Sequence, residues 1–263
     1  MKRYNTNHTF AICAYKESPY LEECIQSLMR QKKKSNIILC TSTPCDYIEQ
    51  MVQKYELPYY IRNGQSDIQD DWNFAFDSAK TDYVTIAHQD DVYSEYYFAE
   101  LSRHLPDKDM SLYITDYLPL KHGQAGPRDI NSKIRRLLRS PLKIKRFAAS
   151  KRMRKLTLAF GNSVCCPSIT YNKKRLGSTI FDSKFKFCID WDTCLKYAGQ
   201  DGHFVYVDKP LVYYRIHDGA TSKEFIEDNR RVGEDIAMFS KFWPKPIVKI
   251  IMLFYKRAYK TYG

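Results

Sequence analysis

Two adjacent carboxylates, Asp90 and Asp91, are the residues of this chain best placed to do chemistry. They follow directly on the short apolar run Tyr83 to Ala87, which is typical of a buried strand in a parallel sheet. Ligands of open α/β sheets bind just beyond the carboxyl ends of such strands. Neighbouring anions repel each other unless a proton or cation is shared between them. The pair therefore predicts a site for Mg²⁺ or Mn²⁺, which prefer oxygen ligands. The alternative is that both residues only cap a helix starting near Ser94.

A third candidate carboxylate, Asp190, lies much later in the chain, just before a predicted helix that begins around Trp191. Because it precedes the helix, we expect it to face a cleft. Asp192 is two residues further on, and a carboxylate there is interpreted as a helix cap. A histidine, His217, follows two short predicted strands that span Phe204 to Arg215 and are broken at Lys209-Pro210. A lone histidine in a turn is more often a surface group than a ligand.

The elements that must position these side chains alternate between strand and helix patterns. Strand patterns occur at 8–14, 36–41, 57–62, 83–87 and 111–116, and helix patterns start near Ser18, Asp46, Asp70 and Ser94. This alternation predicts an α/β fold with a mostly parallel, right-handed central sheet flanked by helices.

The first glycine of the chain is Gly64. Both the dinucleotide-binding fingerprint and the phosphate-binding P-loop need glycines directly after the first strand, so neither is present. A phosphorylated ligand would have to be neutralised by a metal and by side chains. The missing glycines also count against a sugar nucleotidyltransferase.

The composition indicates a folded chain, because 14% of its 263 residues are aromatic. The eight cysteines form no CxxC pair and no zinc-type spacing, which favours reduced, mostly buried thiols. The apolar stretch after the first residues is too short for a signal peptide, and no window reaches the roughly 18 apolar residues of a membrane span. We therefore expect a cytoplasmic protein.

The net charge of +12 comes from one segment. Between Lys121 and Leu156 there are 13 Lys or Arg and only one acid, Asp129, while the other 227 residues carry 29 charges of each sign. Apolar residues alternate with these cations, and the charge density is too high for a core element. The pattern predicts a basic amphipathic insertion on an anionic membrane surface. A solvated hairpin without a partner is the alternative, and no nucleic-acid-binding module accompanies the charges.

The C-terminal stretch Trp243 to Tyr262 repeats this mixture of apolar residues and lysines, with no acid after Asp235. It predicts a second interfacial helix, and packing onto the domain is the competing interpretation.

Four stretches taken together resemble the family 2 glycosyltransferases, inverting enzymes of the GT-A fold that use nucleotide-activated sugars. Phe10 to Ile25 looks like the opening strand and first helix of the family, and His88-Gln89-Asp90-Asp91 resembles its DXD motif. Ile189-Asp190-Trp191-Asp192 is similar to the pair that contains the general base. Tyr214-Arg215-Ile216-His217, followed by Thr221-Ser222, is similar to the closing element that can give a histidine to the metal.

The resemblance implies a role for each matching residue. Asp190 is expected to be the general base, and Asp90 with His217 to hold the divalent metal. The donor nucleotide sugar, with a UDP-sugar as the first candidate, is expected to lie against Ala14, Tyr15, Glu17, Thr41, Asn63, Asn73, His88, Gln89 and Asp90.

Several positions depart from the family pattern. Thr41-Ser42-Thr43 stand where two uracil-reading aspartates are common, which leaves the base open. His88 replaces the first aspartate of the DXD motif, Ile189 replaces a glutamate, and Trp72 replaces an arginine before Asn73. The resemblance implies that these changes fit the branch of the family that makes bacterial surface polysaccharides.

The expectation is therefore one GT-A domain over 1–263, a metal-dependent glycosyltransferase of the hexosyltransferase class. Within it, 8–120 would bind the donor, 121–156 would be the basic insertion, 157–222 would face the acceptor, and 223–263 would form C-terminal helices. The acceptor is expected to be a saccharide hydroxyl, lipid-linked, with the enzyme peripheral on the inner face of the cell membrane and no nucleic-acid partner. The rivals are a sugar nucleotidyltransferase and a non-enzymatic membrane or nucleic-acid adaptor.

Overall fold

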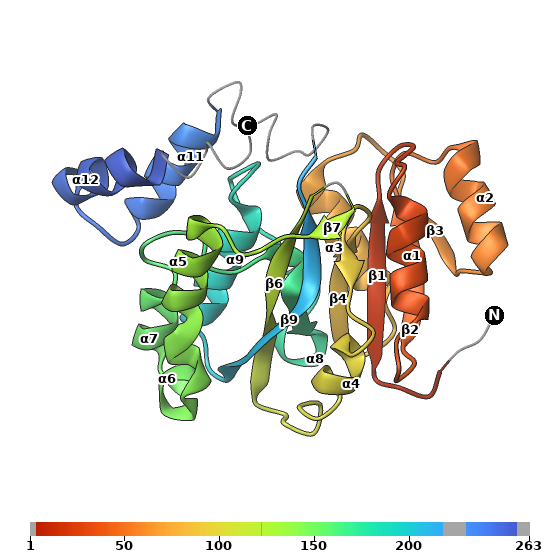
Figure 1. Ribbon diagram of the computed structural model, residues 1–263, viewed down its shortest axis with the longest axis horizontal. Helices are drawn as coiled ribbons and strands as arrows, with labels where there is room; N and C mark the ends of the chain where they lie inside the picture. Colours follow the sequence, from red (N-terminus) through yellow and green to blue (C-terminus); the bar gives the residue numbers. More distant parts are fainter. Residues whose placement is uncertain (1–3, 122, 218–229, 257–263) are drawn as a thin grey trace.

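The structure is a computed structural model, which describes residues 4–121, 123–217 and 230–256. Helices flank one central nine-stranded sheet (Figure 1), with strand order β3-β2-β1-β4-β8-β6-β9-β5 and with β7 paired to β6. The strands are β1 His8–Ala14, β2 Asn36–Thr41, β3 Tyr59–Ile61, β4 Tyr83–His88, β5 Val92–Tyr93, β6 Met110–Lys121, β7 Gln124–Ala125, β8 Ile169–Asn172 and β9 His203–Arg215. The helices are α1 Leu21–Met29, α2 Asp46–Tyr55, α3 Ile68–Ser78, α4 Tyr97–Leu101, α5 Ile130–Arg139, η1 Ser140–Lys143, α6 Lys145–Ala149, α7 Lys151–Leu156, η2 Cys166–Ser168, α8 Lys173–Leu176, α9 Ile189–Ala198, α11 Arg230–Phe239 and α12 Lys245–Tyr255.

The first half of the sheet is parallel, as the alternating pattern predicts. β1 pairs in parallel with β2 and β4, and β2 pairs in parallel with β3. Parallel neighbours need helical crossovers, which α1, α2 and α3 supply. The carboxyl ends of β1, β2 and β4 therefore meet at one edge.

The second half makes the sheet mixed. β8 runs antiparallel to both β4 and β6, while β6 and β9 are parallel. β9 is one strand, so the predicted break at Lys209-Pro210 is wrong. Its register against β6 shifts on both sides of Asp116, which is paired with Pro210. A proline that cannot donate to the ladder is accommodated at such an irregularity.

Alternate residues of β1 supply cores on opposite faces of the sheet. Phe10 and Ile12 pack with α1, α2 and α4, whereas Ala11 packs with α3, α9, α11 and α12. This follows from the two-residue period of a strand. Both faces of the central strands are covered, and this explains their continuous apolar sequence.

The basic segment is not uniformly solvated, contrary to the expectation that its charge is too dense for a core element. Arg139 and Arg154 are fully buried. The Arg139 guanidinium lies against the rings of Tyr117 and Tyr206, at 5.3 and 5.4 Å from their centroids. Arginine is more weakly hydrated than lysine and stacks on aromatic rings, so it can be buried where lysine cannot.

The C-terminal helices pack on the domain at one end and expose apolar residues at the other. Val248 and Met252 of α12 are buried, whereas Ile250, Leu253 and Phe254 are exposed. Packing onto the domain is therefore confirmed for the buried face of α12, and an interfacial role of its exposed face stays a prediction. Residues 257–262 of the predicted helix lie outside the described residues. No helix in the described ranges combines the length and apolarity needed to cross a bilayer.

Candidate active site

Asp90 and Asp91 lie in the turn between β4 and β5, at the carboxyl edge of the sheet. They do not cap a helix, because β5 follows them and α4 begins only at Tyr97. The alternative interpretation of the pair as caps is therefore wrong, and the position beyond the strand is the one expected of a ligand site.

Asp91 is completely buried and ties β4 to the end of β9. Its Oδ1 accepts a hydrogen bond from the backbone N–H of Arg215 at 2.9 Å. The Arg215 side chain donates in turn to the backbone oxygen of Asp90 at 2.7 Å and pairs with Glu23. Burial raises the pKa of Asp91, and the Asp90 charge raises it further. These contacts fix the turn that presents Asp90.

Asp90 is the accessible carboxylate of the pair, with 27% of its side chain exposed. Its Oδ2 lies 3.1 Å from Nε2 of His217, which extends from the end of β9. Burial acts to raise the pKa of Asp90, but the His217 hydrogen bond and the nearby imidazoles outweigh it, so the pKa is lowered. The structure thus brings together the two residues expected to hold a metal. The next residues of the matching motif, Thr221 and Ser222, lie outside the described residues.

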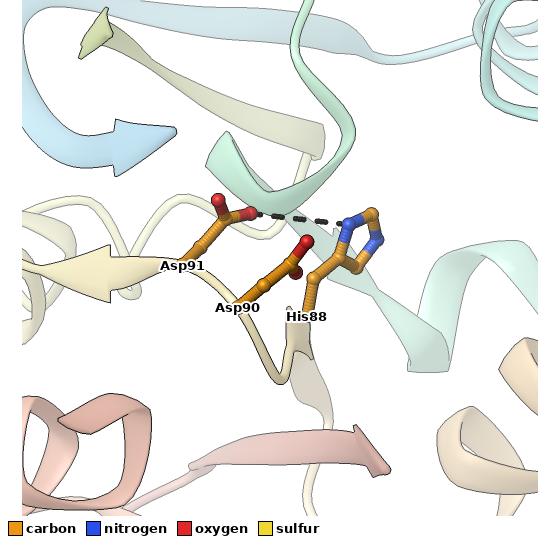
Figure 2. Close-up of side chains that lie close together, drawn as sticks. All are labelled: His88, Asp90 and Asp91. Atoms are coloured by element: carbon orange, nitrogen blue, oxygen red, sulfur yellow. Dashed lines mark ion pairs between the residues drawn. The ribbon is translucent and has the colours of Figure 1, made fainter. Parts of the chain in front are cut away.

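His88 completes the acidic cluster (Figure 2). Its Nδ1 is 3.9 Å from Oδ2 of Asp91, and one potential ligand atom from each of His88, Asp90 and Asp91 lies within 4.8 Å of the other two. The ring stacks on Trp72 at 5.2 Å, and burial lowers its pKa, which favours the neutral imidazole. Trp72, which replaces the expected arginine, therefore supports this imidazole.

The cluster fits a divalent ion by its unsatisfied atoms as well as by its composition. Among the described residues, Oδ2 of Asp91 and Nε2 of His88 are buried without a hydrogen-bond partner. An orphaned buried acceptor costs about 1 to 3 kcal/mol. Carboxylate oxygens with imidazole nitrogen form a donor set that suits Mn²⁺, and the carboxylates alone suit Mg²⁺.

The ends of β1 and β2 lie beside this cluster. Tyr15, which follows Ala14 at the end of β1, exchanges two hydrogen bonds of 3.0 Å with the side chain of Gln89. Lys16 has a positive φ of 52° and donates its N–H to Thr43 at 2.7 Å. An open pocket of about 470 Å³ lies here and is lined by Lys16, Glu17, Thr43, Pro44, Cys45, Asp46 and Tyr47. Thr41 is buried at the end of β2.

Two further residues expected to contact the donor lie on α3 and in the turn after β3. The side-chain amide of Asn73 bonds both the N–H and the carbonyl of Phe181, at 2.9 and 2.7 Å. It is buried and joins α3 to a distant loop, and its contact with the donor stays a prediction. Asn63 is exposed in the turn after β3. The neighbouring Arg62 pairs with Asp71 at 2.7 Å.

The sequence predicted Asp190 just before a helix, but Asp190 lies within the first turn of α9. Its Oδ1 accepts from the N–H of Trp191 and its Oδ2 accepts from Nδ2 of Asn162, both at 2.8 Å. Burial raises its pKa, and these two hydrogen bonds partly offset the rise. A carboxylate with a raised pKa in a partly open site is suited to accept a proton.

Asp192 is not the predicted cap, because the N-cap position of α9 is Cys188. Its carboxylate accepts from Ser183 at 2.8 Å and pairs with Lys241 at 2.5 Å. It joins α9 to the C-terminal helices, which is a structural role.

Asp91 of the acidic cluster and Asp190 both act electrostatically on one residue, Cys165. Burial raises the pKa of the Cys165 thiol, and the charges of both Asp91 and Asp190 raise it further. Cys165 therefore lies within electrostatic reach of both carboxylates. Asn162 was not predicted as a site residue from the sequence, because its role depends on a contact between residues 28 apart. Its only signal was a polar residue in a neutral stretch ahead of β8.

Comparison with known proteins bears on the family and the fold. The family model described as Glycosyl transferase family 2 matches residues 9–176. That range includes β1, the acidic cluster and β8, whereas Asp190 and His217 lie beyond it. No curated protein matches the chain.

Solved structures share the fold at low sequence identity. S. aureus TarS 1–349 in complex with UDP-GlcNAc has a TM-score of 0.58 and 15% identity, covering 88% of this chain and 66% of that one. The mannosyltransferase PcManGT from Pyrobaculum calidifontis, in complex with GDP-Man and Mn²⁺, has a TM-score of 0.63 and 15% identity, with coverages of 95% and 69%. Glucosyl-3-phosphoglycerate synthase from Mycobacterium tuberculosis, with Mn²⁺ and UDP-Glc, has a TM-score of 0.54 and 11% identity, with coverages of 90% and 80%.

The chain spans 42% of the longer TarS structure, so its likeness to TarS concerns one part of that protein. At these identities the neighbours establish the fold, and the family match covers well over half of the chain. The expected family and its α/β fold are confirmed: the chain belongs to glycosyl transferase family 2.

Proposed function

We propose that this protein is a metal-dependent inverting glycosyltransferase that moves a sugar from a nucleoside diphosphate to a saccharide hydroxyl. The observations that carry the proposal are two acidic groups, Asp90 in the turn after β4 and Asp190 at the start of α9, with Cys165 in electrostatic reach of Asp190 and of Asp91, the neighbour of Asp90. Asp90 is accessible and paired with His217, while Asp190 is partly open and has a raised pKa. One group suits a cation and the other suits a proton.

Asp90 and His217 are proposed to hold the divalent ion, Mn²⁺ or Mg²⁺, with His88 adjacent. When bound, such an ion neutralises the diphosphate leaving group as a Lewis acid. Asp91 is fully buried: its Oδ1 keeps the bond to Arg215 that fixes the turn, and its Oδ2, which has no hydrogen-bond partner among the described residues, stays available beside the proposed ion.

Asp190 is proposed to take the proton from the acceptor hydroxyl as that oxygen attacks the anomeric carbon. Attack from the face opposite the leaving group inverts that carbon. General bases of this kind contribute about 10² to 10⁴ in rate. The Asn162 and Trp191 donors occupy one position on each oxygen and leave lone pairs for the acceptor proton.

The donor is proposed to lie between the pocket at Glu17 and the acidic cluster, with Ala14, Tyr15, Thr41 and Gln89 at the ends of β1, β2 and β4. Neighbouring structures hold UDP-GlcNAc, UDP-Glc and GDP-Man. A UDP-sugar is the first candidate for this chain. We assign 8–120 to donor binding and 157–222 to the acceptor.

A thermal-shift panel tests donor binding directly. UDP, GDP, CDP and ADP, each with Mn²⁺ or with EDTA, would be added to the wild type and to Asp190→Asn. A ligand at 100 times its Kd stabilises the native state by about 2.7 kcal/mol. One nucleotide is expected to raise the Tm of both proteins in Mn²⁺, and a panel without any shift would contradict the proposal.

The acceptor is proposed to be a lipid-linked saccharide of bacterial cell-surface polysaccharide synthesis, reached from an anionic membrane surface. Two exposed apolar stripes support this: Ile130, Ile134 and Leu137 on α5, and Ile250, Leu253 and Phe254 on α12. Both helices lie at the end of the molecule away from α1 and α2 (Figure 1).

Cations surround both stripes. Lys133 lies on α5, and Lys245, Lys249 and Lys256 lie on or just after α12, all exposed and without an acid within either helix. Each cation near anionic headgroups contributes about 1 kcal/mol, and the apolar side chains add burial energy. We therefore place the protein peripherally on the cytoplasmic face of a membrane.

Vesicle co-sedimentation tests this surface. Vesicles of phosphatidylglycerol should bind the wild type, those of phosphatidylcholine should bind it weakly, and Leu137→Asp with Leu253→Asp should remove binding. Met29→Asp is the matched control, because Met29 is an exposed apolar residue on the remote helix α1. Equal binding of the double variant, or equal binding to both lipids, would contradict the surface.

A further inference from the structure

We infer that Asn162 is a positioning residue for the Asp190 carboxylate, and that Arg139 of the basic segment holds the loop that carries Asn162. The inference rests on the proposed function of Asp190. It gives part of the basic segment a role in the reaction that is separate from any membrane.

Asn162 reaches Asp190 from a loop between α7 and η2. Its Nδ2 donates to Oδ2 of Asp190 at 2.8 Å, and its Oδ1 accepts from the N–H of Val164 at 3.3 Å. The second bond fixes the amide so that its NH₂ end faces the carboxylate. The carboxylate rotamer is thus held from both sides, by Asn162 and by the N–H of Trp191.

Arg139 holds the next residue of the same loop. Its Nη1 donates to the backbone oxygen of Ser163, and its Nη2 pairs with Oδ1 of Asp116 at 2.5 Å. The guanidinium is completely buried between the rings of Tyr117 and Tyr206. Asp116 lies on β6, in the central sheet. The contacts therefore run without a gap from the sheet through Arg139 to the loop and to Asp190.

A lysine cannot replace this arginine. The planar guanidinium reaches Asp116 and Ser163 from two nitrogens at once, whereas an ammonium is a single point charge with strong hydration. Arg139→Lys keeps the charge that neutralises Asp116 but should release the Ser163 carbonyl. The variant separates positioning from charge balance.

Arg154 offers a matched control in the same segment. It too is fully buried, stacks on Phe204 at 5.0 Å, and donates to two backbone oxygens, those of Gln200 and Gly202, each at 2.7 Å. None of these contacts involves the loop of Asn162. Arg154→Lys should cost similar stability without disturbing Asp190.

The pH profile reports on the carboxylate itself. The charged groups that act on Asp190 are Arg135 of α5 and Arg231 of α11. The titratable groups within its electrostatic reach are Cys165, Cys166, Tyr171, Cys188 and Cys194. None of these is changed by the variants. Loss of the Asn162 donor should raise the pKa of Asp190 and move the acidic limb of the kcat profile to higher pH.

The experiment measures nucleotide release from the donor that binds best, chosen among UDP-glucose, UDP-N-acetylglucosamine and GDP-mannose, with water in place of the acceptor hydroxyl. Asn162→Ala and Arg139→Lys should each lower kcat about 10- to 100-fold with donor KM within about threefold, because misplacing a group by 1 Å costs that much. Both should shift the acidic limb upward. The double variant should be no slower than Asn162→Ala, since both changes act on one contact.

Arg139→Lys with an unchanged kcat, or effects that multiply in the double variant, would overturn the inference. An equal loss in Arg154→Lys would do the same, since it would show a general loss of packing. A crystal structure of Arg139→Lys decides the point without turnover: the bond between Asn162 and Asp190 should be lost, and an intact bond contradicts the inference. Full activity of Asp190→Asn would instead remove the proposed function of that residue.

Discussion

The two halves of the molecule solve the burial of polar groups in opposite ways. In the parallel half, His8 is buried and neutral, with its ring nitrogens 2.7 Å from Ser35 and 2.8 Å from Thr85. Burial lowers the pKa of His8 to about 3. In the mixed half, the buried polar groups include an ion pair, Asp116 with Arg139 at 2.5 Å.

The difference follows from what each half must hold. The parallel half needs only its own strands and crossover helices, so neutral hydrogen bonds between β1 and β4 suffice. The mixed half must attach an inserted basic segment, and it does so by fixing arginines to carboxylates on β6 and β9. Asp208 shows the same device on β9, where it pairs with Arg136 and Lys143. A segment with high positive charge can thus be partly structural.

Removing Asp116, the buried carboxylate of the mixed half, should give the largest effect on stability. Asp116→Ala leaves Arg139 buried without its counter-ion, and breaking a buried pair costs about 3 to 5 kcal/mol. Urea unfolding measures this. Asp201→Ala is the control, because Asp201 is 88% exposed and pairs with Lys151 in solvent, so its loss should leave the urea midpoint nearly unchanged. Equal costs for the two variants would break the comparison.

The proposed general base of the mixed half, Asp190, should be separable from donor binding. Asp190→Asn is expected to lower kcat by about 10³ because it removes the base, with donor affinity changed less than threefold. Calorimetric titration with the donor, beside turnover, measures both quantities. Turnover within tenfold of the wild type would remove Asp190 from its role.

The activity of the wild type should also fall in acid. Because burial raises the pKa of Asp190, its carboxylate takes up a proton at a higher pH than an exposed aspartate does. A protonated base cannot accept the acceptor proton, so kcat should decline as pH falls through that raised value. A profile of kcat that stays flat down to pH 4 would contradict this expectation.

The parallel half should show its own pH dependence of stability, through the neutral buried ring of His8. The folded pKa of His8, about 3, lies below its unfolded value of 6.5, so the unfolded chain binds the proton first. The stability from this group is complete above pH 6.5 and is lost as pH falls. Between pH 6.5 and 5 the loss is about 2 kcal/mol. His8→Gln should flatten the curve in this window, and an unchanged slope would argue against a neutral buried ring.

Much of the parallel half was predictable from local patterns. Apolar runs and helical spacing place β1, β2 and β4, and the carboxyl end of β4 locates Asp90 without any tertiary knowledge. The mixed half was less accessible. The burial of Arg139 depends on Asp116, Tyr117 and Tyr206, which lie far away in sequence, so local charge density pointed to solvent.

Other differences have the same origin. Lys209-Pro210 looked like a strand break, but the register shift beside Asp116 absorbs the proline. Asn73 was predicted to lie at the donor from its place in a local motif, but its amide donates one hydrogen bond to the backbone of Phe181, 108 residues away, and accepts one from it. In both cases the contact is with a partner distant in sequence.

The central claim is that a divalent ion at Asp90 neutralises the diphosphate of the donor. Calorimetric titration of the wild type and Asp90→Asn with UDP, in Mn²⁺ and in EDTA, tests it most directly, with GDP as the second nucleotide. One nucleotide should bind the wild type only when Mn²⁺ is present, and Asp90→Asn should lose at least tenfold in affinity, about 1.4 kcal/mol. Equal affinity in EDTA, or in Asp90→Asn, would contradict the claim.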